Sequence, residues 1–327
     1  MFNYLTVWNR WLGQRMIFVS ILALLIGFNL PLPKVLFSEN VTIICFVYLT
    51  FITSLDVHFR DFIKIIKRPI LPLGMLVLIH IVMPIVAWGI GYLFFPHDFN
   101  TRLGLLISSA IPVGLSSIVW TGIGGGNIVL ALVVVVMDTL LSPIILPGFF
   151  ALVVGENIQI EYSQMIIELI WMVAVPSFAA MTLNDITQGK LEPFSRSIGG
   201  LTAKIGVFFI ILVNAAIIAP EIEWGASLLK LLFVIFLLTI SGYLLGYLAS
   251  FALKDRSRST VISMVYNVGM RNISFGFVLA LTYFPTAVAV PITLASVYNQ
   301  PLASIVSWVF NRKAENHMSK SMRNETH

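Results

Sequence analysis

Long runs of apolar residues alternate with short polar segments along the whole chain. An α-helix needs about 20 apolar residues to cross the hydrocarbon core of a bilayer. We expect membrane-spanning helices at residues 16–31, 41–56, 70–95, 103–122, 127–154, 163–182, 202–220, 227–252, 259–283 and 287–310. Nine spans are the alternative, because 103–154 is nearly continuous, but GIGGGN at Gly122 to Asn127 marks a tight reversal. The pattern predicts an all-α polytopic membrane protein with ten transmembrane helices.

Three segments outside these runs have patterns of their own. The first residues, MFNYLTVWNRWLGQR, are amphipathic and aromatic, and no small-residue cleavage site of a signal peptide follows the first apolar run. The segment 56–69, DVHFRDFIKIIKRP, carries apolar residues at helical spacing, which predicts a cytoplasmic interfacial helix. The polar residues 312–327 are expected to form a disordered cytoplasmic tail.

Basic residues gather in the loops on one predicted side of the membrane. Of the 20 basic residues, only Lys34, Arg102 and Lys230 fall on the opposite side, and Arg271 falls inside a span. Because basic loops are retained in the cytoplasm, this distribution favours an even number of spans with both termini cytoplasmic. We therefore expect a multi-pass protein of the cytoplasmic membrane.

The composition narrows the class of protein further. The chain has 327 residues, 58% hydrophobic and 11% charged, with a mean hydropathy of +0.94, whereas soluble domains carry about a quarter charged residues. The net charge of +5 is explained by cytoplasmic loops rather than by nucleic-acid binding. The single cysteine, Cys45, excludes an internal disulfide and a thiolate metal site. The sequence contains no metalloprotease, P-loop or serine-hydrolase motif, so neither an enzyme nor a cofactor is expected.

Two pairs of motifs recur in the two halves of the chain. IPVGLSS in the fourth span and YNVGMRN in the ninth each place a Val-Gly pair at mid-membrane, and MDTLLSP and VYNQP follow downstream, ending at Pro143 and Pro301. Five spans per half invert the second copy, which divides the chain into repeats at 1–155 and 156–311. Inverted repeats with interrupted helices indicate a secondary transporter whose site lies at the repeat interface. The alternative is that Gly and Pro are simply common in membrane helices.

At these motifs the chain resembles the bile acid:sodium symporter family. LDVHFRDFIKIIKRP is similar to the family's interfacial segment, and IPVGLSSIVWTGIGGGNIVLALVVVVMDTLLSPIILP is similar to its fourth and fifth spans. NVGMRN resembles the motif on its second crossing helix. The resemblance covers nearly the whole chain. It implies a panel and a core domain, discontinuous helices four and nine that cross at unwound centres, and transport of organic anions, usually driven by sodium.

The residues that this resemblance implies as sodium ligands are only partly matched. The motif on helix nine carries a glutamate and a glutamine where this chain has Asn267 and Arg271, and a glutamine on helix three corresponds to His80. The other side-chain ligands fall at Ser117, Ile118, Ala131 and Val135. Only the serine, with the carbonyls of Val268 and Met270, remains as an oxygen donor. Because a guanidinium replaces a ligand and the carboxylate is lost, we do not expect sodium coupling of the usual kind.

The ionisable residues inside the spans each allow two interpretations. Arg271 lies near the centre of its span, where a charge costs roughly 2.5–3.5 kcal/mol on insertion scales. It either pairs with a buried acid or orphan carbonyls, or lies in the cavity, where its planar fork suits a carboxylate or sulfonate. Asp138 is the obvious acidic partner, or else a proton carrier. His80 is either a packed, hydrogen-bonded side chain or a second proton site.

Other polar and backbone groups complete the predicted pathway. Asn299 and Gln300 precede Pro301 and serve either as interhelical contacts or as substrate contacts. The predicted substrate or ion pathway comprises Arg271, Asn267, Asn272, Ser116, Ser117, His80, Asp138, Asn299 and Gln300. The predicted helix-break backbone comprises Pro112, Gly114, Val268, Gly269 and Met270.

These features support three hypotheses. The first is a secondary transporter for small organic anions that works by alternating access and is proton-linked or uncoupled. The second is a sodium symporter whose ions use backbone carbonyls and Asn267. The third is a non-transporting membrane receptor or sensor that kept the fold. The expected partners are an organic anion and the lipid bilayer, and the sequence carries no signal for an oligomeric state.

Overall fold

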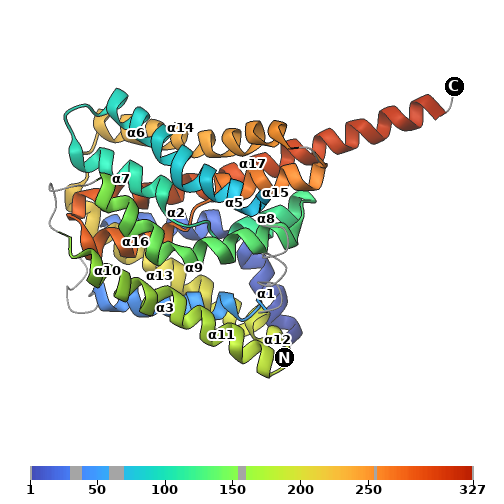
Figure 1. Ribbon diagram of the computed structural model, residues 1–327, viewed down its shortest axis with the longest axis horizontal. Coiled ribbons are helices and arrows are strands. Elements are labelled where there is room, and N and C mark those ends of the chain that lie inside the picture. The colour runs from blue at the N-terminus through green and yellow to red at the C-terminus, as the bar shows by residue number, and fades with distance from the viewer. Residues whose placement is uncertain (1, 30–38, 59–69, 154–159, 254–255, 326–327) are drawn as a thin grey trace.

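The computed structural model describes residues 2–29, 39–58, 70–153, 160–253 and 256–325, and helices form almost all of it (Figure 1). Within these residues the only β-structure is a single bridge between Val113 and Arg271. The elements are α1 (Phe2–Gln14), α2 (Met16–Asn29), α3 (Glu39–Ser54), α5 (Ile70–Val77), η1 (Leu78–Val82), α6 (Met83–Phe94), α7 (Phe99–Ala110), α8 (Ser116–Gly124), α9 (Ile128–Val153), α10 (Tyr162–Leu169), η3 (Ile170–Ala174), α11 (Val175–Ile186), α12 (Glu192–Phe194), η4 (Ser195–Gly199), α13 (Gly200–Ile218), η5 (Ala219–Glu221), α14 (Ala226–Ala249), η6 (Ser250–Ala252), α15 (Arg258–Gly269), α16 (Ile273–Tyr283) and α17 (Thr286–Glu325).

Each segment selected by its hydropathy coincides with a helix, or with two helices separated by a short break. Five helices in the described residues are long and apolar enough to cross a membrane by themselves: Ile70–Phe94, Ile128–Val153, Tyr162–Ile186, Glu192–Glu221 and Ala226–Ala252. The first two helices form a further apolar pair with a bend of 69° between them. An all-helical membrane architecture is therefore confirmed, and a total of ten spans stays a prediction.

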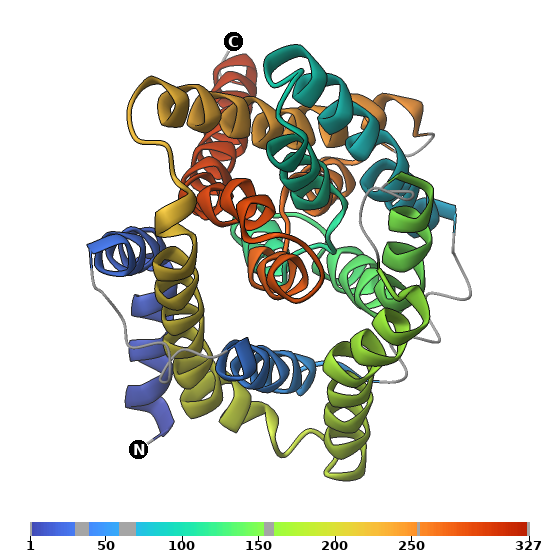
Figure 2. The ribbon, with the colours of Figure 1, turned by 90° about the vertical axis from the view of Figure 1, so that its left-hand side faces the viewer.

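The helices pack as two groups (Figure 2). In the first group, α13 contacts α2 and α3, and α3 also contacts α11. In the second group, α7 contacts α6 and α17, and α15 contacts α8 and α14. The groups meet where α16 packs against α3 and where α17 packs against α2 and α13.

The first interruption in the second group separates α7 from α8. α7 ends at Ala110 because the next residue, Ile111, precedes Pro112 and takes an extended conformation. A residue before proline is disfavoured in the helical region, since the proline ring clashes with its backbone. α8 then begins at Ser116. The break predicted in the IPVGLSS motif is therefore confirmed.

The second interruption separates α15 from α16. α15 ends at Gly269, and Met270 is extended. Asn272 then caps α16, because its side-chain oxygen accepts from Phe275 N at 3.2 Å. The break predicted in the YNVGMRN motif is also confirmed.

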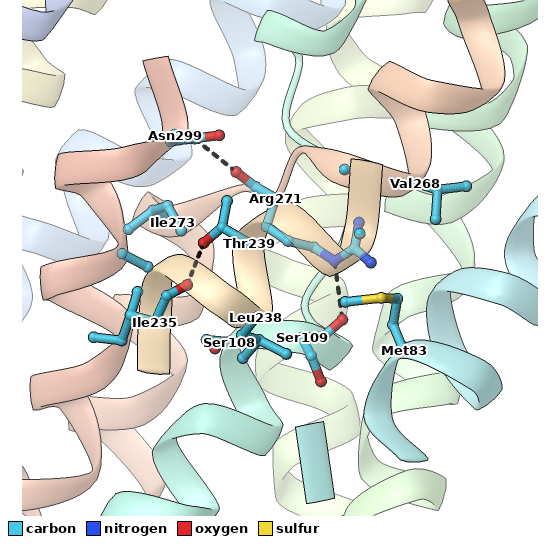
Figure 3. Close-up of a pocket in the computed structure, with 13 residues that line it drawn as sticks. Met83, Ser108, Ser109, Ile235, Leu238, Thr239, Val268, Arg271, Ile273 and Asn299 are labelled. Atoms are coloured by element: carbon cyan, nitrogen blue, oxygen red, sulfur yellow. Dashed lines mark hydrogen bonds between the residues drawn. The ribbon is translucent and has the colours of Figure 1, made fainter. Parts of the chain in front are cut away.

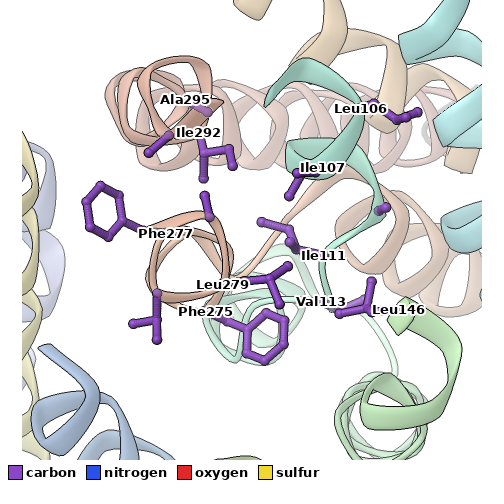
Figure 4. Packing of buried hydrophobic residues seen from close by; sticks show 14 of the residues in the cluster. Leu106, Ile107, Ile111, Val113, Leu146, Phe275, Phe277, Leu279, Ile292 and Ala295 are labelled. Carbon is purple, nitrogen blue, oxygen red and sulfur yellow. The ribbon is translucent and has the colours of Figure 1, made fainter. Parts of the chain in front are cut away.

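α16 and α17 pack against α7 at the centre of the molecule. Buried aliphatic and aromatic side chains such as Ile107, Phe277 and Ile292 come together there (Figure 4). Gly104 lets α7 approach α17 closely, since a Cβ at this position would contact the backbone oxygen of Val288 and would lie 2.8 Å from Pro291 Cγ. This approach requires a residue without a side chain.

We expect Gly104→Ala to lower the thermal stability of the protein in detergent. The added methyl group would force α7 and α17 apart, and overpacking of this kind costs about 1–3 kcal/mol. Gly74→Ala is the matched control, because nothing lies within 4 Å of a Cβ at Gly74. Equal unfolding temperatures for the two variants would contradict the close approach of these helices.

Two predicted segments differ from the structure or fall outside its description. α17 continues to Glu325, where a disordered tail was predicted at 312–327. The residues after Asn311 contain no Gly or Pro, and nine of the sixteen are Lys, Ala, Glu, Met or Arg, which favour helix. Most of the predicted interfacial helix at 56–69 lies outside the described residues, as does Lys34.

Charged side chains join the ends of α3, α11 and α12. The two ring nitrogens of His58 lie 2.7 Å from Asp185 Oδ1 and 3.2 Å from Glu192 Oε1. Arg196 lies 2.8 Å from Glu192 and 3.5 Å from Asp56. Because these residues come from three separate segments, the cluster fixes one end of the first helix group.

Candidate functional site

The two helix breaks contact each other inside the second helix group. Val113 and Arg271 form an antiparallel bridge. Asn272 N donates to Pro112 O at 2.8 Å. Each interruption therefore supplies a partner to a backbone group that the other has released from its helix, as buried peptide groups require.

Gly114 makes a second contact at this crossing. Its N–H donates to Met270 O at 3.4 Å. A Cβ at Gly114 would lie 2.9 Å from Arg271 O, which is closer than side-chain carbons approach a backbone oxygen. The glycine of the first motif is therefore needed for the two chains to cross.

The Arg271 side chain is buried beside the crossing, with 7% of its surface exposed. Its Nε donates to Ser109 O at 2.9 Å (Figure 3). Its Nη1 lies 3.3 Å from Met270 O and 3.4 Å from Asn267 O. Its Nη2 has no hydrogen-bond partner among the described residues. Carbonyl oxygens at the ends of broken helices therefore hold the guanidinium, and a helix C-terminus attracts a cation.

Asp138 pairs with His80, not with Arg271, the partner that one of its two interpretations gave it. Asp138 is fully buried on α9. Its Oδ1 lies 2.5 Å from His80 Nε2, and its Oδ2 accepts from Val113 N at 2.7 Å. Both carboxylate oxygens are thus engaged, and no carboxylate of the described residues lies within ion-pair distance of the Arg271 guanidinium.

His80 reaches Asp138 from the π-turn η1, which interrupts the long helix of α5 and α6. Pro84 has no N–H to donate to the carbonyl of residue 80, so the helix widens there. Since Asp138 also accepts from Val113, the pair connects this π-turn to the first helix break. A buried titratable pair is thereby in direct contact with the crossing.

A small cavity lies beside the Arg271 side chain (Figure 3). Its volume is about 30 Å³, which is room for roughly two water molecules. Its walls come from α6, α7, α14, α15, α16 and α17. The polar residues in the walls are Ser108, Ser109, Thr239, Arg271 and Asn299, and the others are apolar or glycine.

The neutral polar groups of the cavity already have partners. Ser108, Ser109 and Thr239 donate their hydroxyl hydrogens to carbonyls of the preceding helical turn, at 2.7–2.8 Å. Asn299 Nδ2 donates to Arg271 O at 3.2 Å. The guanidinium is the one charged group in this lining, so a small anion is the ligand that complements the cavity.

Two side chains of the predicted sodium site, Ser117 and Asn267, contact each other outside the cavity lining. Ser117 Oγ donates to Asn267 Oδ1 at 3.3 Å, and Asn267 Nδ2 donates to Ser263 O at 2.8 Å. All three residues are fully buried. The side-chain oxygen of Asn267 is therefore already engaged, and only its backbone oxygen faces Arg271.

The remaining predicted residues have structural contacts. Gln300 Oε1 accepts from Trp120 Nε1 at 2.8 Å, Asn272 caps α16, and Ser116 begins α8. None of the three lines the cavity, although Asn299 next to Gln300 does. In the helix-break backbone, Val268 and Gly269 line the cavity, while Pro112, Gly114 and Met270 make the crossing.

Sequence reasoning predicted the span at 227–252 but missed that this helix, α14, supplies Thr239 and Gly242 to the cavity walls. A local signal was present, because Gly242 and Gly246 form the spacing G-x-x-x-G that lets membrane helices approach closely. A Cβ at Gly246 would lie 2.7 Å from Met264 O. α14 therefore packs directly on the backbone of α15 and reaches the site.

Comparisons with known proteins agree with this arrangement. Residues 43–228 match the model of the sodium bile acid symporter family. The "Uncharacterized protein YbaS" of Bacillus subtilis (strain 168) is 32% identical over 268 residues, which cover 82% of this chain and 87% of the relative. The "Uncharacterized sodium-dependent transporter YocS" of the same strain is 26% identical over 310 residues, 94% of each chain. The "Probable sodium/metabolite cotransporter BASS1, chloroplastic" of Arabidopsis thaliana is 28% identical over 239 residues, 71% of this chain and 57% of the plant protein.

The family match begins within α3 and ends within α14. It therefore includes the first helix break, the π-turn of His80 and the buried Asp138. The match extends over more than half of the chain, and the helices that carry His80 and Asp138, Ile70–Phe94 and Ile128–Val153, are long and apolar enough to cross a membrane. The chain belongs to the sodium bile acid symporter family and is a multi-pass membrane transporter.

Proposed function

We propose that this protein is a secondary transporter of small organic anions and that Arg271 is the fixed positive charge of its substrate site. The observation that carries the proposal is the buried guanidinium, which lines the cavity without an acidic partner and with Nη2 unpaired in the described residues. A charge in that position is costly unless an anion compensates it. A transported anion supplies the missing charge.

The cavity favours a carboxylate or a sulfonate as the group that is bound. One guanidinium provides a planar pair of donors, which matches two oxygens of such a group. The other lining residues are neutral, so a single negative charge is the matching number. A volume of about 30 Å³ admits a head group and no more, and the helices around the cavity must move before a larger molecule enters.

The same guanidinium argues against sodium as the coupling ion. Its Nη1 donates to the carbonyl oxygens of Asn267 and Met270 at the crossing, the region where the family resemblance implies a bound cation. Two unit charges about 4 Å apart repel each other by about 4 kcal/mol at an effective dielectric constant of 20, which corresponds to roughly a thousand-fold in affinity. Arg271 thus holds the broken helices and the substrate without a bound ion. Coupling, where it exists, uses protons at His80 and Asp138.

Uptake of substrate into proteoliposomes should be unchanged when sodium is replaced by choline. The substrate is first identified as the organic acid that raises the unfolding temperature of the purified protein most. A steep, saturable dependence on sodium would sink this proposal and support the sodium-driven alternative, which the name of the relative YocS favours. Stabilisation by an acid without any uptake would support the sensor hypothesis instead.

Alternating access gives the two helix groups distinct roles. The first group serves as the panel and the second as the core, within two inverted repeats of five spans at 1–155 and 156–311. The two broken helices of the core lie in different repeats, as that symmetry requires, and both reach the cavity. The core carries Arg271 past the panel and so exposes the site to each side in turn.

Both termini lie in the cytoplasm in this proposal. In a Cys45→Ser background, a membrane-impermeant thiol reagent should label His97→Cys from outside intact cells. Arg258→Cys should react only after the membrane is permeabilised, because it belongs to the basic loops of the other side. Both side chains are exposed in the structure. Labelling of both positions from the same face would contradict the ten-span orientation.

A further inference from the structure

α1 presents two different faces along its length. Asn9 belongs to the face that contacts the protein: its Nδ2 donates to Arg196 O at 2.8 Å, and its Oδ1 accepts from Lys204 Nζ. Through these bonds α1 is attached to η4 and α13. The side of the helix that carries Asn9 is therefore engaged with the protein.

The opposite face of α1 is apolar, aromatic and exposed. The exposed fractions are 79% for Tyr4, 67% for Val7, 57% for Trp8 and 45% for Trp11. Positions 4, 7, 8 and 11 follow the i, i+3, i+4, i+7 spacing of one helix face, so these residues form one continuous stripe. Trp8 and Trp11 contact each other edge to face, with ring centroids 5.6 Å apart. We call this set the aromatic stripe.

The aromatic stripe continues into an exposed apolar surface across a sharp bend. α2, which is apolar enough to count as part of a membrane span, exposes Phe18, Leu22 and Leu25. The bend between the two helices is 69°, so α1 runs closer to the membrane plane than to its normal when α2 crosses the bilayer. At the bend, the Arg15 guanidinium lies 4.2 Å from the Trp11 ring centroid.

We propose that α1 is an interfacial helix whose aromatic stripe is immersed at the boundary between the lipid headgroups and the acyl chains. Tyrosine and tryptophan favour that depth, because their rings are apolar while their O–H and N–H groups remain hydrated. Arg15 then reaches the phosphate level and binds lipid phosphate groups. The occupant of the stripe is the bilayer, since the stripe is continuous with the exposed apolar face of α2 and ends at a cation.

This arrangement gives the transporter a direct contact with the membrane surface. Asn9 connects the immersed helix to Arg196, which belongs to the charged cluster at the end of the first helix group. The bonds of Asn9 therefore link the depth of α1 in the interface to the position of η4 and α13. Lipid phosphate groups and the protein contact α1 from opposite sides.

The experiment measures the depth of α1 in reconstituted protein. Single cysteines replace Val7 or Trp8 in a Cys45→Ser background of the full chain and carry a bimane fluorophore, and Glu223→Cys, in an exposed loop, is the aqueous control. The vesicles contain phosphatidylcholine brominated either near the headgroup or deep in the acyl chain. We expect quenching at positions 7 and 8 to be several-fold stronger with shallow bromines than with deep ones, and weak quenching by aqueous iodide. Glu223→Cys should be quenched strongly by aqueous iodide and only weakly by bromines at either depth.

Two further results decide the proposal. Equal iodide quenching at positions 7, 8 and 223 would place the stripe in water and overturn it. Close approach between labels on separate copies, seen as dipolar broadening of nitroxides at position 7, would assign the stripe to a protein interface and also overturn it.

When phosphatidylglycerol is added to the vesicles, quenching by shallow bromines should rise. Arg15→Gln should remove that rise, because a basic residue near an anionic surface contributes roughly five-fold in binding.

Discussion

Replacing Arg271 with glutamine is expected to weaken binding of the stabilising organic acid by about ten- to a hundred-fold. The substitution removes a charge-assisted contact, which contributes roughly 1.5–3 kcal/mol, and leaves a neutral amide facing the cavity. The measurement is the concentration of acid needed to raise the unfolding temperature of the purified variant. Uptake into proteoliposomes should fall in parallel.

Two variants separate the charge of Arg271 from its shape and from its place in the fold. Arg271→Lys keeps the charge but loses the planar fork, so it should bind the acid more tightly than Arg271→Gln and less tightly than the unmodified protein. Arg102→Gln removes an arginine outside the cavity lining and should leave the affinity unchanged. If Arg271→Gln lowers only the folded yield and the remaining folded protein binds the acid normally, the arginine acts in structure alone.

Asp138→Asn is expected to abolish stimulation of uptake by an inward proton gradient. An amide cannot take up or release the proton, and it offers one oxygen where the carboxylate offers two acceptors, to His80 and to Val113 N. One of those buried groups loses its partner, at a cost of about 1–3 kcal/mol in stability. The measurement is uptake with and without an acidic exterior, accompanied by a thermal unfolding curve.

His80→Gln tests the same pair from its other member and should also remove the stimulation. His97→Gln is the matched control, because His97 is exposed and makes no contact with the crossing. It should respond to the gradient like the unmodified protein. Full stimulation in a folded Asp138→Asn variant would exclude this pair as the proton site.

The helix breaks were predictable because their causes are local. Pro112 forces an extended residue before it, and the Val-Gly pairs lie next to polar groups in otherwise apolar runs. The hydropathy of the chain likewise determines where helices form, so the predicted segments and the observed helices coincide. Such features need no information about distant parts of the sequence.

The partner of Asp138 was not predictable from the same information. Charge alone suggests Arg271, but partner choice depends on which atoms the packing brings within about 3 Å. The π-turn at His80 and the extended backbone at Val113 place two other groups against the carboxylate. The carbonyl of Ser109 meanwhile accepts from the arginine. Orphan carbonyls were one of the two partners expected for Arg271, but the sequence does not show which carbonyls, or which side chain, the packing brings to each charged group.

The crossing of the two breaks has a consequence for how the family can diversify. Its contacts run from peptide group to peptide group, between Pro112 and Asn272 and between Gly114 and Met270. Peptide groups are the same whatever side chain they carry, so mutations can replace the neighbouring ligands without dismantling the junction, provided that Gly114 is kept. A lineage can therefore change the side chains around the crossing while inheriting the same scaffold.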